Sequence, residues 1–208
     1  MDVLQHILTM INSAAPESLA LSLGDCHVRG LFSLVIRGQE FGHLTRIFVA
    51  QSEIKPFDVQ LHTHRYSIRL TTISGQIRHH RAFRHEAGEL KLSEYSYSSG
   101  ITAQSTLTYL GETRINCQDY YLPPGTSIEL SNTDIHSISC SQGSIWMVEE
   151  LGYRTAYSRV LGIPFEVDGM YANCSESQIA AIRTLVIQHL NTILSNTLTS
   201  DPEYEKDN

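Results

Sequence analysis

The chain has 208 residues, a hydrophobic share of 41% and a formal net charge of −7 at pH 7 with histidine neutral. These values predict one domain with an ordinary core, and the acidic balance excludes a general nucleic-acid or anionic-membrane surface. No apolar run approaches the ~20 residues that span a bilayer, and an N-terminus with Asp2 and no basic start does not predict a secretory signal.

The cysteines are widely spaced and form no C-x-x-C pair; they are Cys26, Cys117, Cys140 and Cys174. This pattern favours free thiols over a disulfide framework, which is typical of a reducing compartment. We therefore expect a cytoplasmic protein. The sequence also lacks the glycine-rich nucleotide-binding motifs and the serine-hydrolase elbow.

The N-terminal segment, residues 1–30, is expected to be helical at its start. Apolar side chains recur at helical spacing from Val3 to Ile11, which predicts a short amphipathic helix packed against the body of the protein. Pro16, after two alanines, ends it.

Residues 31–165 have a different character, with short β-rich runs separated by turn signals such as Ser74-Gly75 and Pro123-Pro124-Gly125. Nine or ten such runs indicate an all-β antiparallel sandwich or barrel, and a double-sheet jelly roll fits the count. The expected strands are 31–36, 44–49, 61–70, 76–83, 89–97, 106–110, 114–122, 127–130, 135–140 and 145–150.

A second helix is expected over residues 175–198. Ser175 and Gln178 form the pattern of a capping box, and apolar residues from Ile179 to Leu194 keep helical spacing. The acidic tail, residues 199–208, is expected to be disordered. The end helices and the sheet edges offer surfaces for a homodimer.

Two histidines lie one residue apart in the run Leu61–Leu70. On a strand, His62, His64, Tyr66 and Ile68 would share one side. Imidazoles about 7 Å apart along a strand can tilt onto one cation at ~2.0–2.1 Å. A remote segment must supply the third ligand, and His136 is the best candidate. The alternative is a pair of polar histidines lining a metal-free cavity.

This spacing resembles the first motif of the cupin superfamily, in which a His-x-His pair is followed by a glutamate and a closing glycine. His62 and His64 match the pair, and Gly75 falls at the closing glycine. The glutamate position is Ile68, which cannot bind a metal, and the leading glycine is Pro56.

The second cupin motif combines a glycine, a Pro-x-Gly and a histidine. Gly125 and His136 fit it, while Ser131 and Thr133 replace the proline and glycine. The resemblance covers roughly residues 56–140. Without the glutamate, the site would be a three-histidine variant similar to the cysteine-dioxygenase branch.

The resemblance implies a double-stranded β-helix, or jelly-roll cupin barrel, that acts on a small molecule. It implies an oxygen-dependent, dioxygenase-like oxidation at one divalent metal, with Fe(II) favoured; Zn, Ni, Mn or Cu also suit three imidazoles. Two alternatives stay open. One is a non-catalytic cupin that binds a small ligand or has a regulatory role, and the other is a metal-dependent isomerase or lyase.

Four further residues are candidates for the site. Tyr66 would hydrogen-bond a substrate or donate a proton, unless it only lines the barrel. Cys140 shares the face of His136, either as a small buried side chain or as a thiolate ligand. His79 and Arg81 belong to a basic stretch that would capture a carboxylate or phosphate, or else form a solvated strand face.

Overall fold

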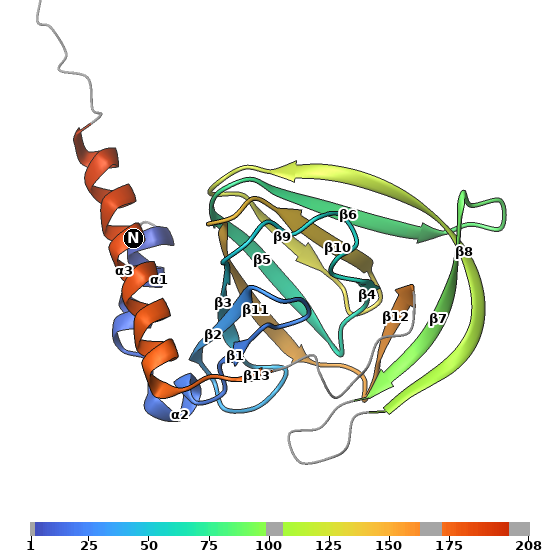
Figure 1. Cartoon of the computed structure of the whole chain (residues 1–208), viewed down its shortest axis with the longest axis horizontal. Helices are drawn as coiled ribbons and strands as arrows, with labels where there is room; N and C mark the ends of the chain where they lie inside the picture. The colour runs from blue at the N-terminus through green and yellow to red at the C-terminus, as the bar shows by residue number, and fades with distance from the viewer. Residues whose placement is uncertain (1–2, 99–105, 163–171, 200–208) are drawn as a thin grey trace, which may run out of the picture.

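The computed structural model describes residues 3–98, 106–162 and 172–199. The fold is built mainly from antiparallel strands in two sheets, with helices on the outside of one of them (Figure 1). The predicted class, an all-β jelly-roll barrel with flanking helices, is confirmed.

The first sheet has seven strands in the order β13-β1-β2-β3-β11-β5-β9. The strands β10-β4-β12-β7-β8-β6 form a second sheet that closes on itself. In chain order they are β1 (Leu23–Gly24), β2 (Leu31–Arg37), β3 (Thr45–Ala50), β4 (Leu61–His62), β5 (Tyr66–Ser74), β6 (Ile77–Arg84), β7 (Leu90–Ser98), β8 (Thr106–Leu122), β9 (Ser127–Leu130), β10 (Ile135–Cys140), β11 (Ile145–Tyr153), β12 (Ser158–Gly162) and β13 (Ala172–Asn173).

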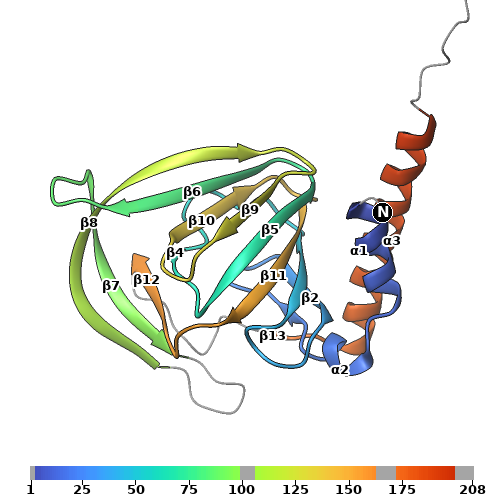
Figure 2. The ribbon, with the colours of Figure 1, turned by 180° about the vertical axis from the view of Figure 1, so that it is seen from behind.

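Three helices accompany the sheets: α1 (Val3–Asn12), α2 (Pro16–Leu19) and α3 (Glu176–Thr199). Figures 1 and 2 show α1 and α3 side by side against the outer face of the first sheet. The predicted capping box is present, because Ser175 N–H donates to Gln178 Oε1 (2.9 Å) and Gln178 N–H donates to Ser175 Oγ (3.3 Å). No helix in the described part of the chain is long and apolar enough to cross a membrane.

The central strands of the first sheet are apolar on both faces because each face meets a different layer. Phe32 and Ile47 pack against α1 and α3 in one cluster of buried side chains. Phe48 and Trp146 point the other way, into the space between the sheets, and their rings stack at 5.3 Å with an interplanar angle of 8°. Sheet strands covered on both sides are expected to lack a clean polar–apolar alternation.

The predicted continuous strand 61–70 is wrong in one respect. It is broken at residues 63–65, so that β4 belongs to the second sheet and β5 to the first. The crossing segment is held by other parts of the chain: Thr63 N–H donates to Arg159 O (2.9 Å), and Arg65 O accepts from Arg154 N–H (2.8 Å). Contacts made far along the chain therefore override the local β propensity of this segment.

Other boundaries also differ from expectation. The predicted strands 106–110 and 114–122 are one strand, β8, whose pairing with β7 shifts register where Glu94 faces Gly111. The helical N-terminal segment also contributes β1, which pairs with β13 just before α3. The tail, from residue 200 onward, lies outside the described residues.

Candidate metal centre

Three histidines from separate segments meet at one point between the sheets. His62 ends β4, His64 lies in the crossing segment, and His136 is in β10 directly opposite His62 in the strand register. One ring nitrogen from each lies within 4.8 Å of the others. The Nε2 atoms of His64 and His136 are 2.7 Å apart. The break in the predicted strand lets His64 turn toward β10.

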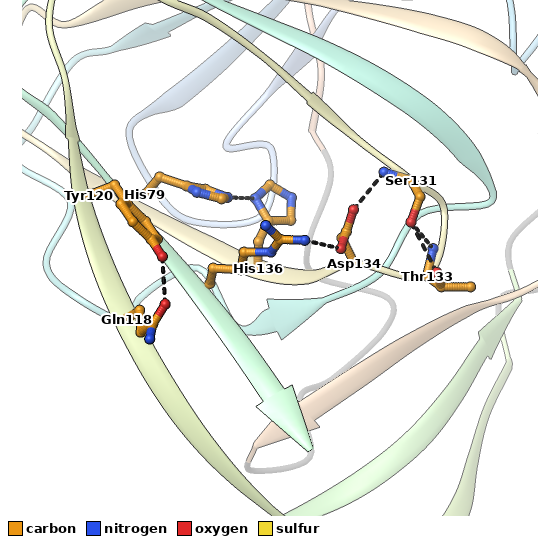
Figure 3. Close-up of polar contacts among 8 residues, drawn as sticks. His79, Gln118, Tyr120, Ser131, Thr133, Asp134 and His136 are labelled. Carbon is orange, nitrogen blue, oxygen red and sulfur yellow. Dashed lines mark hydrogen bonds and ion pairs between the residues drawn. The ribbon is translucent and has the colours of Figure 1, made fainter. Parts of the chain in front are cut away.

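The rings of two of these histidines are oriented by a partner on their other nitrogen. His62 Nδ1 lies 2.7 Å from Gln60 O; a carbonyl only accepts, so Nδ1 carries the proton and Nε2 keeps its lone pair. His136 Nδ1 lies 3.1 Å from His79 Nε2, as Figure 3 shows. Partners of this kind fix the tautomer and direction of metal-binding imidazoles in known sites.

The donor set fits a divalent ion. Nitrogen ligands at ~2.0–2.1 Å from a metal lie about 3.0–3.4 Å from one another, so the observed spacing needs only small ring movements. Three protein ligands also leave positions open for other molecules, which distinguishes catalytic from structural sites. The three histidines could therefore hold one ion and leave part of its coordination sphere facing the cavity.

The electrostatic environment keeps these rings neutral. Burial lowers the pKa of His62 below its usual value, although the Gln60 contact acts the other way. Burial, followed by repulsion from neighbouring imidazoles, lowers the pKa of His64 and His136 well below 6.5. A neutral imidazole has the lone pair that a metal requires, so the cluster is ready to bind without first losing protons.

The cluster opens onto a cavity of about 680 Å³. Most of the wall is apolar and comes from the inner face of the first sheet, including Phe48, Trp146 and Val148. Tyr66 also lines it, with its ring 5.9 Å from that of His64. Burial, and then the nearby Glu150 carboxylate, raise the pKa of Tyr66, so its hydroxyl stays protonated.

A buried ion pair lies in the same wall. Arg46 Nε is 3.1 Å from Glu150 Oε1, and both side chains line the cavity. The second carboxylate oxygen of Glu150 accepts from the backbone N–H groups of Gly42 (2.5 Å) and Leu44 (3.3 Å). Charged pairs are costly to bury, so this pair depends on the additional hydrogen bonds that satisfy the Glu150 carboxylate.

The other predicted site residues lie elsewhere. Among the described residues, the cavity wall does not include Cys140, His79 or Arg81. Cys140 is buried in the apolar cluster between the sheets. Arg81 Nη2 pairs with Asp134 Oδ1 at 2.7 Å. Asp134 lies just before β10 and is labelled in Figure 3. As expected for neighbours on a strand, His79 and His80 face opposite ways, and His80 contacts Asp119 and Ser139.

Sequence reasoning missed His27. It lies in the loop between β1 and β2, lines the cavity, and stacks on His62 with ring centroids 5.3 Å apart. A single histidine in a loop carries no spacing signal, and nothing in the residues around it indicates which way the ring points.

Comparisons with known proteins give only distant likenesses. No protein-family model matches the sequence, and no curated protein is significantly similar to it. One structure that resembles the fold is the hydroxypropylphosphonic acid epoxidase from S. wedmorenis, with a TM-score of 0.38 and 13% identity, covering 61% of this chain and 53% of that chain. The chain thus spans about half the length of that enzyme.

Two hydroquinone 1,2-dioxygenase structures are also similar. The enzyme PnpCD in complex with Cd²⁺ and 4-hydroxybenzonitrile gives a TM-score of 0.34 at 11% identity, covering 72% of this chain and 76% of that chain. The enzyme from Sphingomonas sp. TTNP3 with 4-hydroxybenzoate bound gives 0.36 at 11%, covering 69% and 74%. These likenesses are too distant to assign a function to this chain. A functional proposal must therefore rest on the residues of the site itself.

Proposed function

We propose that the chain is a metal-dependent enzyme that oxidises a small molecule with dioxygen at a mononuclear centre held by His62, His64 and His136. The observation that carries the proposal is the convergence of three neutral imidazoles, with ligand nitrogens within 4.8 Å, on one wall of a largely apolar cavity. A redox-active divalent metal, Fe(II) above all, would supply the electrons that activate dioxygen there.

The protein groups around the centre have separate tasks. Gln60 and His79 hold the rings of His62 and His136 so that their free nitrogens point to a common position. The apolar wall around Phe48 and Trp146 binds the carbon skeleton of a substrate and keeps bulk water away. Tyr66, with its retained proton, would hydrogen-bond a substrate that lies next to His64.

The cavity volume limits the substrate to a small molecule. A volume of about 680 Å³ lies in the ordinary range for pockets that bind drug-sized ligands. Macromolecules would reach the metal only through a protruding group. Since three neutral histidines leave the charge of a divalent ion uncompensated, a substrate with an anionic donor atom is favoured.

The first test is metal content. Protein purified without chelator, or reloaded with Fe(II) without air, should contain about one ion per chain by elemental analysis. His64→Ala and His136→Ala should each remove most of it, because two imidazoles bind far more weakly than three. The exposed His43 provides a matched control, and His43→Ala should keep the full content.

The second test separates oxidation from other chemistry. The Fe(II)-loaded protein should consume dioxygen in the presence of a member of a panel of small aromatic and aliphatic acids, and His136→Ala should not. Metal content equal in the wild type and the His64→Ala variant would contradict the centre and leave a ligand-binding protein without catalysis. Turnover without dioxygen uptake would indicate an isomerase or lyase.

A further inference from the structure

His27 reaches the cavity from outside the two strands that carry His62 and His136. It belongs to the loop that joins β1 to β2, and its backbone has a φ of +68°, in the left-handed region. Histidine adopts this conformation less readily than glycine does, since its Cβ crowds the backbone. Conformations of this kind are concentrated at functional sites, where neighbouring structure holds them in place.

Neighbouring structure does hold this loop. Asp25 Oδ1 accepts a hydrogen bond from Gly30 N–H at 2.7 Å. Cys26 N–H donates to Leu31 O and Gln51 N–H donates to Gly30 O, both at 2.7 Å. The side chain of Cys26 is buried in the cluster between the sheets. With the residues on both sides fixed, the His27 ring is directed at the cavity.

The ring lies beside the three proposed ligands and is not one of them. It stacks on His62 at a centroid distance of 5.3 Å and an interplanar angle of 26°. The group of nitrogens close enough to share one ion consists of His62, His64 and His136. His27 lines the same cavity as all three. It therefore borders the cavity directly beside the proposed centre.

The charge of a bound ion favours an anion at this place. A divalent ion on three neutral imidazoles keeps its full charge, whereas the Arg46 guanidinium in the same cavity is already paired with the Glu150 carboxylate. The imidazole ring of His27 carries at least one N–H in every protonation state, which is the kind of donor that an anionic oxygen accepts from.

We propose that His27 is a further substrate-contacting residue, which donates a hydrogen bond to an anionic oxygen bound at the open positions of the metal. The proposal rests on the proposed metal centre and names the substrate class: a small molecule that presents a carboxylate, enolate or phenolate oxygen to the ion. His27 selects this oxygen, and the apolar wall accommodates the rest of the molecule.

The test uses Co(II) as a spectroscopically visible metal and azide as the anion. Co(II)-loaded wild type should bind azide with a change in its visible spectrum. The His27→Asn and His27→Gly variants should keep a Co(II) affinity within about threefold of the wild-type value. Their affinity for azide should be about tenfold lower, which is the effect of one lost hydrogen bond to a charged group. Both variants accept a left-handed backbone, so folding is retained.

Matched variants make each outcome decisive. His43→Asn makes the same chemical change at an exposed loop position and should leave the azide affinity at its wild-type value. Unchanged azide affinity in both His27 variants overturns the proposal. Loss of Co(II) from them, as from His64→Ala, also overturns it, because His27 would then be a ligand. A wild type that binds no Co(II) instead refutes the metal centre itself.

Discussion

His79 Nε2 lies 3.1 Å from His136 Nδ1, on the side of the His136 ring that faces away from His64. The contact fixes the direction of His136. We predict that His79→Leu lowers the affinity for Co(II) by 10–100-fold, about the effect of losing such an orienting partner. Titration calorimetry would measure this.

The adjacent His80 is the matched control for His79. It is equally buried, but its ring contacts Asp119 and Ser139 on the opposite side of β6. His80→Leu should lower thermal stability and leave Co(II) affinity within about threefold of the wild type. Equal losses of affinity in the two variants would show that general disruption of β6, and not the contact with His136, is responsible.

Replacing either Arg46 or Glu150 alone should lower the free energy of unfolding strongly, and replacing both together should lower it less than the two single effects combined. Glu150→Leu leaves the Arg46 charge buried without its partner, and we expect a loss of about 3–5 kcal/mol in the free energy of unfolding. Arg46→Met together with Glu150→Leu should cost clearly less than the two single changes added together. Urea unfolding of all four proteins gives the coupling energy, and simple additivity would contradict the prediction.

The buried histidines predict acid sensitivity of the metal-free protein. Burial lowers the pKa of His27 to about 3 and that of His79 to about 4. The unfolded chain binds protons on these groups below about pH 6.5, and the folded chain does not. The contribution of these histidines to the free energy of unfolding should therefore be fully present above pH 6.5. It should decrease toward pH 4, by up to about 1.4 kcal/mol per pH unit for each group.

Urea unfolding between pH 7.5 and pH 5 tests this dependence. His79→Gln removes one of the titrating groups, so its stability should fall less steeply with acidification than that of the wild type. A wild-type stability that is constant or rises toward pH 5 would show that these imidazoles are not held neutral by the fold.

Gly75 closes the turn between β5 and β6, and its φ is +88°. A Cβ at this position would lie 2.3 Å from Ser144 Oγ and 2.6 Å from Ser144 Cα. At Gly143, with φ +80°, nothing lies within 4 Å of an added Cβ. Gly143→Ala should therefore cost only the left-handed strain, about 1–2 kcal/mol, and Gly75→Ala clearly more because Ser144 must move. Thermal unfolding would rank the two, and equal losses would contradict the clash.

Much of the architecture was predictable because its signals are local. Strand and turn residues indicated the two-sheet barrel, and Ser175 with Gln178 indicated the start of α3. The meeting of His62, His64 and His136 was predictable from a pair on one segment and a third histidine on a distant strand. The metal-binding role of these residues stays a prediction.

The remaining features depend on contacts between distant segments. Nothing between His62 and Tyr66 marks a break, and the crossing is set by hydrogen bonds to residues such as Arg159. His79 was a candidate for substrate capture or for a solvated strand face, and no sequence pattern indicated its contact with His136 on the neighbouring strand β10. The cavity-facing position of His27 depends on the hairpin β1–β2 and its anchors, which no periodicity reveals.

The pairing of β1 with β13 connects the strand that follows α1 and α2 to the strand that precedes α3. It leads directly into α3, whose Val186 and Leu190 are fully buried against the sheet together with Ile7 and Ile11 of α1. If proteolysis after Asn173 were followed by dissociation of α3, the apolar outer face of the first sheet would be exposed to water. The cleaved protein would then aggregate, although every residue of the proposed metal centre would still be present.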